Sequence, residues 1–395
     1  MERSMSLKPA NIVRHYVLAA GGTGGHMVPA HALAAELMRR GHHVALVTDE
    51  RGAKIPGLFD GVQTHVLPAG RLSGGPIGWL RAGRSILAGR DMARRLNETF
   101  RPSAVVGFGG YPAFPALLAA LKDGIPTAVH EQNAVLGRVN RLLAGKVDAI
   151  ATAYPQVDRL KPKYQAKTVL VGNPVRDIVK EIGNQPFPPL SEDGPFRVLV
   201  TGGSQGATIL SDVVPDGLGQ LPMPLRQRLQ VTQQCRPEDI EQVRAKYGFL
   251  GIPADLATYF ADLPEKLALA HLVIARAGAS TIADVSVAGR PAILVPLPSA
   301  MDDHQTANAR EMAEGGGARA IAQSHFTPEE LARQMLHLAE EPETLLNAAN
   351  RARACGRPHA AQDLADLIER LGPTPVMDGL PVDAPASGQL KGAFA

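Results

Sequence analysis

Two glycine-rich turns have the composition of anion-binding sites. They are Gly21-Gly22-Thr23-Gly24-Gly25-His26, which follows the apolar run Tyr16–Ala20, and Gly202-Gly203-Ser204-Gln205-Gly206, which follows Val198–Thr201. A strand, a tight turn and a helix start direct backbone N–H groups and the positive end of a helix dipole at one point, which favours a phosphate. Neither turn has the G-x-G-x-x-G pattern of dinucleotide-binding proteins or the Gly-Lys-Ser/Thr of a Walker loop. The pair therefore predicts phosphate binding of another kind.

Four further clusters of polar residues stand at the ends of predicted strands. In a parallel α/β sheet, ligands bind at the carboxyl ends of the strands, so these clusters are expected to line one cleft. The clusters are His130-Glu131-Gln132-Asn133, Gly172-Asn173-Pro174-Val175-Arg176, Arg276-Ala277-Gly278-Ala279-Ser280-Thr281 and Asp302-Asp303-His304-Gln305.

A general base is the first chemical role that these residues suggest. His26 stands at the cleft end of the first turn, and imidazole titrates near neutral pH, so it is a candidate to take a proton from a hydroxyl nucleophile. Glu131 is a rival base and His130 a weaker one. In the alternative interpretation His26 only donates a hydrogen bond to a backbone carbonyl, and His130 and Glu131 only position Asn133.

Strands that alternate with helical stretches predict an α/β fold with two doubly wound parallel sheets. The strands expected in the first half are Tyr16–Ala20, Val44–Thr48, Val62–Leu67, Val105–Gly110, Thr127–His130, Ala149–Thr152 and Val169–Gly172. Those expected in the second half are Arg197–Thr201, Leu229–Thr232, Thr258–Phe260, Leu272–Ile274, Ala292–Val295 and Ala318–Ile321. Helices are expected over Ala30–Arg39, Ile209–Gly217 and Thr327–Leu371, and a loop over Gly70–Gly78.

Composition limits the class of protein. A chain of 395 residues is too long for one ordinary core, which predicts two domains. The two cysteines, Cys235 and Cys355, lie far apart, which argues against a disulfide framework and fits a reducing compartment. We see no signal peptide, and no stretch approaches the roughly 20 apolar residues of a membrane-spanning helix.

Charge is distributed unevenly along the chain. Residues 1–176 hold 23 Lys and Arg against 11 Asp and Glu, a balance of +12, whereas residues 177–395 hold 18 against 27, a balance of −9. This asymmetry suggests that the first half meets an anionic partner. A basic, solvated face without a partner is the alternative.

The segment Ile77–Leu96 is both basic and amphipathic. It carries Trp79 and Leu80 among its apolar residues and several arginines, including Arg81 and Arg84. Such a segment can lie on an anionic membrane surface. A helix that packs on the core and turns an arginine-rich face to solvent fits the pattern equally well.

Six motifs in order, GGTGGH, HEQN, GNPVR, GGSQGA, RAGAST and DDHQTANA, resemble the MurG family of N-acetylglucosaminyltransferases. The resemblance runs from about Val17 to about Leu371. It implies a GT-B fold, in which two Rossmann-like domains face each other across a cleft and the C-terminal helix returns to the first domain. The implied division is a disordered leader at 1–11, an acceptor- and membrane-facing domain at 12–176, a linker at 177–196, a UDP-GlcNAc-binding domain at 197–355, the returning helix at 356–372 and a disordered tail at 373–395.

The resemblance also implies a reaction. N-acetylglucosamine (GlcNAc) would pass, with inversion, from UDP-GlcNAc to the C4 hydroxyl of the MurNAc sugar of undecaprenyl-pyrophosphoryl-MurNAc-pentapeptide, a step of peptidoglycan synthesis. The family works at the cytoplasmic face of the bacterial inner membrane as a peripheral protein. We therefore expect an anionic membrane surface and other cell-wall synthesis proteins as further partners, and no nucleic acid, cofactor or metal.

The family's binding residues transfer position by position. Ser204 and Arg176 would stabilise the UDP leaving group, although a surface salt bridge is an alternative role for Arg176. Asp284 stands where the family usually has Glu, so its contact to the ribose would be longer or bridged by water. The remaining expected contacts to the donor, and in the case of Asn133 to either sugar, are Thr23, Gly24, Gly25, Asn133, Ala261, Ala279, Ser280, Thr281 and Gln305.

Three other functions compete with this interpretation. A related enzyme of the same fold, either a glycosyltransferase with a soluble acceptor or a UDP-GlcNAc 2-epimerase, is the nearest. A nicotinamide-dependent oxidoreductase is disfavoured because the dinucleotide pattern is absent and only Asp49 could hold a ribose. A non-catalytic membrane scaffold is the third.

Overall fold

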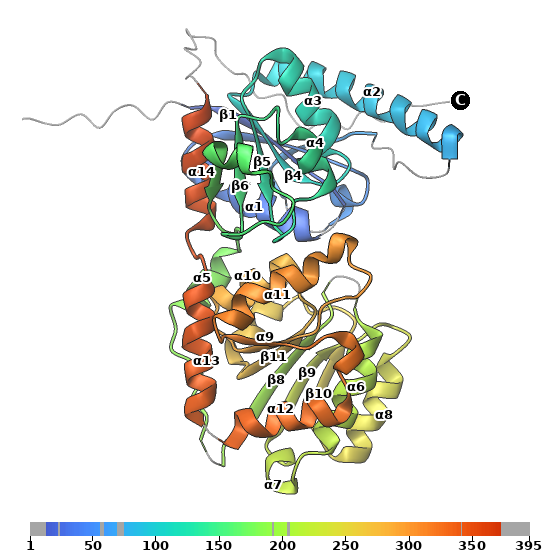
Figure 1. The fold of residues 1–395 in the computed structure, drawn as a ribbon, viewed down its shortest axis with the longest axis vertical. Helices are drawn as coiled ribbons and strands as arrows, with labels where there is room; N and C mark the ends of the chain where they lie inside the picture. Colours follow the sequence, from blue (N-terminus) through green and yellow to red (C-terminus); the bar gives the residue numbers. More distant parts are fainter. Residues whose placement is uncertain are drawn as a thin grey trace, which may run out of the picture.

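Each half of the chain builds a parallel β-sheet with helices packed around it, and the two units are stacked along the long axis of the molecule (Figure 1). The computed structural model describes residues 13–22, 24–55, 59–68, 75–191, 193–203, 206–340 and 342–372, with backbone alone for 76–81, 340 and 342. The strand orders are β3-β2-β1-β4-β5-β6-β7 and β10-β9-β8-β11-β12-β13. The predicted fold class, two doubly wound parallel sheets, is confirmed.

The strands are short and correspond closely to the predicted apolar runs. Those of the first sheet are β1 (His15–Ala20), β2 (His43–Thr48), β3 (Gln63–Val66), β4 (Ala104–Gly109), β5 (Thr127–Glu131), β6 (Ala149–Thr152) and β7 (Thr168–Leu170). Those of the second are β8 (Phe196–Thr201), β9 (Leu229–Gln234), β10 (Ala254–Ala257), β11 (Leu272–Ala275), β12 (Ala292–Leu294) and β13 (Ala318–Ala320).

Helices connect these strands. In the first half they are α1 (Gly24–Arg39), η1 (Gly52–Lys54), α2 (Gly75–Phe100), α3 (Ala113–Asp123), α4 (Arg138–Leu143), η2 (Pro162–Lys167) and α5 (Asp177–Gly183). In the second they are α6 (Thr208–Gly219), α7 (Met223–Arg226), α8 (Ile240–Leu250), α9 (Leu263–Leu269), α10 (Ala279–Val287), η3 (Met301–Asp303), α11 (His304–Glu314), η4 (Gln323–His325), α12 (Pro328–Glu340), α13 (Pro342–Cys355) and α14 (Ala360–Leu371). Among the residues with a described position, no helix is both long enough and apolar enough to cross a bilayer.

Four predicted boundaries are wrong. The strand expected at Thr258–Phe260 lies earlier, at β10, because Tyr259 is 77% exposed and its aromatic ring belongs to a surface turn rather than to the sheet. Helix α1 begins within the glycine motif rather than at Ala30. Helix α2 begins at Gly75, inside the expected loop. The helical region before Leu371 is broken into three helices.

Strand β1 lies in the interior of the first sheet and is buried on both faces. It pairs in parallel with β2 on one side and β4 on the other. Tyr16 and Leu18 enter the core on one face, and Val17 and Ala19 enter the core on the opposite face. A strand that is covered on both faces needs a continuous apolar run rather than an alternating one. This explains why every residue of Tyr16–Ala20 is apolar or aromatic.

The last helix, α14, crosses back and packs on the first unit, where it lies beside α1 (Figure 1). Its Leu364, Leu367 and Ile368 are buried in the core that contains β1. Arg40 of α1 reinforces the contact through ion pairs with Asp366, at 2.6 Å, and with Glu369, at 2.9 Å. The return of the C-terminal helix, which the resemblance implies, is thereby confirmed.

Replacement of Ile368 by Ala should destabilise the first unit because it leaves a cavity between α14 and the sheet. Loss of a buried aliphatic side chain of this size costs about 2–5 kcal/mol. Urea denaturation followed by circular dichroism measures the change. Arg370→Ala, on the exposed face of the same helix, is the matched control and should change the unfolding free energy little. Equal effects of the two substitutions would contradict the packing role of α14.

Candidate active site

The first glycine turn connects β1 to α1 and contacts the turn after β4. Gly22 and Gly110 both adopt left-handed backbone conformations, with φ of +60° and +80°. A Cβ atom on Gly110 would lie only 2.9 Å from the Cα atom of Gly21, so the two turns approach each other as closely as backbones allow. Gly24 and Gly25 form the start of α1, and Thr23 lies outside the described residues. The contact holds the start of α1 at the carboxyl edge of the sheet.

His26, in the first turn of α1, lies against Gly109 of β4. A Cβ atom on Gly109 would come within 3.0 Å of the imidazole Cε1 atom, and Gly109 has a φ of +95°, so this position requires glycine. The imidazole Nδ1 is 3.2 Å from Gln132 Oε1. Burial lowers the pKa of His26, while the Glu131 carboxylate and the hydrogen bond to Gln132 act in the opposite direction. His26 is therefore neutral at pH 7 and can accept a proton.

Glu131, the rival base, is 2% exposed, and four donors occupy its carboxylate. They are the backbone N–H groups of Asn133 (3.1 Å) and Gly137 (2.7 Å) and the side-chain amides of Asn133 (3.2 Å) and Asn140 (2.8 Å). This arrangement argues against a proton-transfer role and favours the alternative, in which Glu131 positions Asn133. His130 is also buried, and burial lowers its pKa to about 4.

Asn308, on α11, joins the two units at the cleft. Its Oδ1 accepts a hydrogen bond from the backbone N–H of Ala134, at 2.8 Å. Its Nδ2 donates to Asn133 Oδ1, at 3.0 Å, and to the carbonyl of Ala277, at 3.2 Å. One buried amide thus connects the HEQN segment to the segment that precedes α10. The sequence alone predicts no role for Asn308. A polar residue between two alanines that are both buried nevertheless indicates a side chain that is buried and hydrogen-bonded.

Asp302 makes a second contact between the units. Its carboxylate pairs with Arg141, at 2.9 Å, and with Arg159, at 2.7 Å. Asp302 and Arg159 both adopt positive φ values. Three residues further along from Asp302, Gln305 is held by a hydrogen bond from the backbone N–H of Leu297 to its Oε1, at 2.9 Å. The ion pairs therefore tie η3, which immediately precedes the helix that carries Gln305, to the first unit.

Three buried polar atoms on or beside α10 have no partner among the described residues. They are Ser280 Oγ, Asp284 Oδ1 and Arg176 Nε. Arg176 is close enough to Asp284 to lower its pKa, although burial dominates and raises that pKa to about 6. Buried polar groups are normally paired and a helix N-terminus favours an anion, so the Ser280 hydroxyl and the Arg176 guanidinium are candidates to bind an anionic ligand here, whereas the Asp284 carboxylate would need a hydrogen-bond donor. Ala279 and Thr281 complete the first turn of this helix.

The other residues that the sequence predicts for the site or the membrane contact lie in other parts of the chain. Ala261 is exposed in the turn between β10 and α9, and Ser204 lies outside the described residues. Trp79, Leu80 and Arg81 are in α2, where only the backbone is described, and Arg84 is exposed on the same helix.

Comparison with known families decides the identity of this arrangement. Residues 16–152 match the glycosyltransferase family 28 N-terminal domain, and residues 197–371 match the glycosyltransferase family 28 C-terminal domain. The chain belongs to glycosyltransferase family 28. A nicotinamide-dependent oxidoreductase and a non-catalytic scaffold are poor explanations for a chain that matches both domains of a transferase family.

Similar proteins of family 28 span nearly the whole chain. A protein of Zymomonas mobilis is 64% identical over 383 residues, which cover 97% of this chain and 99% of that protein. One of Erythrobacter litoralis is 63% identical and covers 93% of each chain. Both are named UDP-N-acetylglucosamine–N-acetylmuramyl-(pentapeptide) pyrophosphoryl-undecaprenol N-acetylglucosamine transferase.

Solved structures give the same result for the fold. The crystal structure of MurG from Acinetobacter baumannii has a TM-score of 0.74 and 33% identity, and the match covers 90% of this chain and 99% of that one. The UDP-GlcNAc 2-epimerase of Neisseria meningitidis has a TM-score of 0.62 but only 13% identity. The similarity between this chain and the epimerase is therefore a similarity of fold only.

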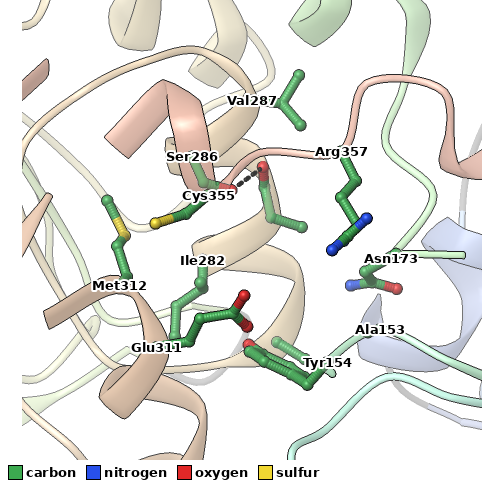
Figure 2. A pocket seen from close by; sticks show the side chains of 13 residues that line it. Ala153, Tyr154, Asn173, Ile282, Ser286, Val287, Glu311, Met312, Cys355 and Arg357 are labelled. Carbon is green, nitrogen blue, oxygen red and sulfur yellow. Dashed lines mark hydrogen bonds between the residues drawn. The ribbon is translucent and has the colours of Figure 1, made fainter. Parts of the chain in front are cut away.

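This family 28 chain also has a cavity of about 420 Å³, counted with its open mouth, where the chain crosses between the units (Figure 2). Tyr154 and Asn173 line it from the first unit, Glu311 from the second, and Arg357 from the segment that leads to α14. Both polar atoms of the Asn173 amide are buried without a partner among the described residues. The candidate catalytic side chains do not line this cavity, so it belongs to the crossover rather than to the site of chemistry.

Asp284→Asn should stabilise the protein at neutral pH. The raised pKa of Asp284 means that the folded state resists its ionisation, so a penalty develops as pH rises from the unfolded pKa near 4 to the folded value near 6. Removal of the charge should increase the unfolding free energy at pH 8 by up to about 3 kcal/mol, and by much less near pH 4. Urea denaturation at the two pH values measures this difference. Asp60→Asn, at an exposed carboxylate, is the control, and a destabilised Asp284→Asn at pH 8 would contradict the assignment.

Proposed function

We propose that this chain transfers GlcNAc from UDP-GlcNAc to the C4 hydroxyl of the MurNAc sugar of undecaprenyl-pyrophosphoryl-MurNAc-pentapeptide. One observation carries the proposal: Asn308 joins the segment of Gln132, which contacts the neutral His26, to the segment that leads into α10, where Ser280 and Asp284 have unpartnered polar atoms. The names of the relatives, which cover the chain almost completely, supply the substrates.

The donor would bind mainly to the second unit. Its diphosphate would lie at the N-terminus of α10, where backbone N–H groups, Ser280 and Thr281 can donate hydrogen bonds. Asp284, one turn further along this helix, would accept a hydrogen bond from the ribose. The uracil would meet the backbone at Ala261, and Gln305 would hold the GlcNAc hydroxyls. Asn133 would contact a sugar from the first unit.

The leaving group needs stabilisation because negative charge develops on the UDP as the sugar departs. Arg176 supplies a positive charge beside α10, and the helix dipole and its free N–H groups add to it without reorganisation. Ser204 and the turn around it, together with Thr23, Gly24 and Gly25 of the first turn, would contribute further donors. In this proposal these residues together would stabilise the charge that develops on the UDP.

His26 would act as the base. As the C4 hydroxyl oxygen attacks the anomeric carbon from the face opposite the UDP, the imidazole takes its proton, and the configuration inverts. The lowered pKa suits this role because the imidazole is already unprotonated at neutral pH. Glu131 is assigned to the positioning of Asn133 instead.

His26→Ala should lower kcat by at least about a hundredfold, the range of general-base catalysis. Radiolabelled UDP-GlcNAc, a short-chain analogue of the lipid-linked acceptor and EDTA in the assay measure acceptor-dependent, metal-independent transfer. His337→Ala, at an exposed histidine of α12, is the matched control and should retain wild-type activity.

Other outcomes of this assay would revise the proposal. If the His26→Ala variant still transfers GlcNAc, the protein is a transferase but a residue other than His26 is the base. Formation of a new sugar nucleotide from UDP-GlcNAc alone, without the acceptor, would indicate the epimerase. Loss of wild-type transfer in EDTA that Mg²⁺ restores would contradict the metal-independent mechanism.

We also propose that the first unit docks peripherally on the cytoplasmic face of the bacterial inner membrane. The N-terminal end of α2 projects beyond the sheet (Figure 1), whereas its later residues Ala93 and Leu96 are buried in the core beside α3. On the same helix Leu87 is 51% and Met92 44% exposed. We therefore assign the core-packing interpretation to the later part of the helix and propose the membrane-surface interpretation for its N-terminal part. Other cell-wall synthesis proteins are candidate partners at the same surface.

Simultaneous replacement of Trp79 and Leu80 by Ser should release the protein from vesicles that contain anionic lipid, because it removes the apolar anchors but keeps the arginines. Co-sedimentation measures the bound fraction. Phe249→Ser is the matched control, since Phe249 is 92% exposed on the second unit and its loss should not change binding. Unchanged binding of the double variant would show that this part of α2 is not the contact.

The division of the chain into domains is part of the same proposal. An acceptor- and membrane-facing domain would comprise residues 12–176, a linker 177–196 and the UDP-GlcNAc-binding domain 197–355, followed by the returning segment 356–372. The start of β8 at Phe196 and the packing of α14 on the first core support these limits.

A further inference from the structure

We propose that Gln132 is a positioning residue that determines which nitrogen of His26 carries the proton. This inference rests on the proposed role of His26 as the base, and it concerns a side chain that makes no direct contact with the reacting hydroxyl. A neutral imidazole is a base at one nitrogen and a donor at the other. The tautomer therefore decides whether the nitrogen that faces the acceptor can take a proton.

The orientation of the Gln132 amide follows from its backbone partners. One atom of the amide lies 2.9 Å from the carbonyl oxygen of Phe108 and 3.2 Å from that of His130. Carbonyl oxygens only accept hydrogen bonds, so this atom must be the nitrogen, Nε2. The amide oxygen, Oε1, is then the atom that faces His26.

His130 fixes the same orientation independently. Its Nε2 lies 2.8 Å from the carbonyl oxygen of Gly172 and must donate to it, which leaves the His130 Nδ1 as an acceptor. That Nδ1 lies 3.0 Å from Gln132 Nε2, which donates to it. Two sets of backbone carbonyls, at Phe108 and at Gly172, thus orient the amide in the same way.

The consequence for His26 is a single tautomer. Its Nδ1 lies 3.2 Å from an oxygen that can only accept, so Nδ1 carries the proton and the lone pair is on Nε2. The opposite tautomer would place two lone pairs against each other. Gln132 is 2% exposed and His130 is completely buried, so water cannot replace either partner and relax this preference.

The chain of hydrogen bonds also reaches the crossover between the units. Gly172 has a φ of +93° and immediately precedes Asn173, which lines the crossover cavity (Figure 2). The carbonyl that holds His130 therefore belongs to the segment that leads into the second unit. The base and the crossover are connected through two buried side chains.

The nitrogen shifts of the wild-type imidazole test the tautomer directly. Protein labelled with ¹⁵N-histidine gives distinct signals for protonated and unprotonated ring nitrogens, and His26→Ala assigns the His26 signals by their loss. At pH 7.5 the His26 Nδ1 should be of the protonated type and Nε2 of the unprotonated type. The reverse pattern, or an average of the two, would overturn the proposal whether or not the enzyme is active.

Two variants test the consequence for catalysis. Gln132→Leu removes the acceptor and should lower kcat by about 10- to 1,000-fold, with the KM for UDP-GlcNAc within about threefold of wild type. Gln132→Glu keeps an oxygen towards Nδ1 but places its second oxygen opposite the carbonyls of Phe108 and His130, so it should recover only part of the lost kcat. The added negative charge should also move the acid limb of the pH–rate profile to higher pH. Gln165→Leu, at an exposed glutamine, is the matched control.

A double variant separates this inference from the proposed function. If Gln132 acts through His26, Gln132→Leu should cause no further loss of kcat in the His26→Ala background. A full additional loss there would overturn the positioning role and leave His26 as the base. Wild-type activity of His26→Ala would instead remove the base assignment itself, whereas the nitrogen shifts would still report the tautomer.

Discussion

The amide of Asn308 is the interaction on which the proposed site depends. It accepts from the backbone after β5 and donates both to Asn133 and to the carbonyl that precedes α10. Because the amide is completely buried, each of these bonds is made without competition from water, and loss of any one would leave a buried polar group unpaired. The bridge fixes the proposed donor helix relative to the segment that carries Glu131 and Gln132, which a contact between two apolar surfaces would not do with the same precision.

The parallel sheets explain why the chemistry gathers at this bridge. In each sheet an interior strand, β1 or β8, is followed by a glycine turn, and the carboxyl ends of neighbouring strands open on the same edge. His26 follows β1 and lies against Gly109 at the end of β4, while α10 follows β11, the neighbour of β8. The two edges bring their side chains together, so a base from one unit and an anion site from the other can serve one substrate pair.

The sequence predicts much of this arrangement because strands buried on both faces have an unmistakable apolar pattern and because ligand-binding residues follow strand ends. His26, Asn133 and the first turn of α10 were all predicted as site residues in this way. Hydrogen-bond partners could not be predicted, since the position of Glu131 at a strand end does not reveal that four donors occupy its carboxylate. Gln132 and Asn308 were missed for the same reason: an amide has no characteristic spacing, and its role depends on atoms that are distant in the sequence. The strand predicted at Thr258–Phe260 was placed too late because a single sequence does not distinguish an exposed aromatic residue such as Tyr259 from a buried one.

A crystal structure of the protein with UDP-GlcNAc would test the central claim, that the second unit holds the donor and presents it to a base on the first. We expect the diphosphate at the N-terminus of α10 and the ribose within hydrogen-bond distance of Asp284. The anomeric carbon of GlcNAc should face His26 Nε2, with room for an acceptor hydroxyl between them. A donor whose diphosphate lies on the first glycine turn, with the sugar directed away from His26, would contradict this claim.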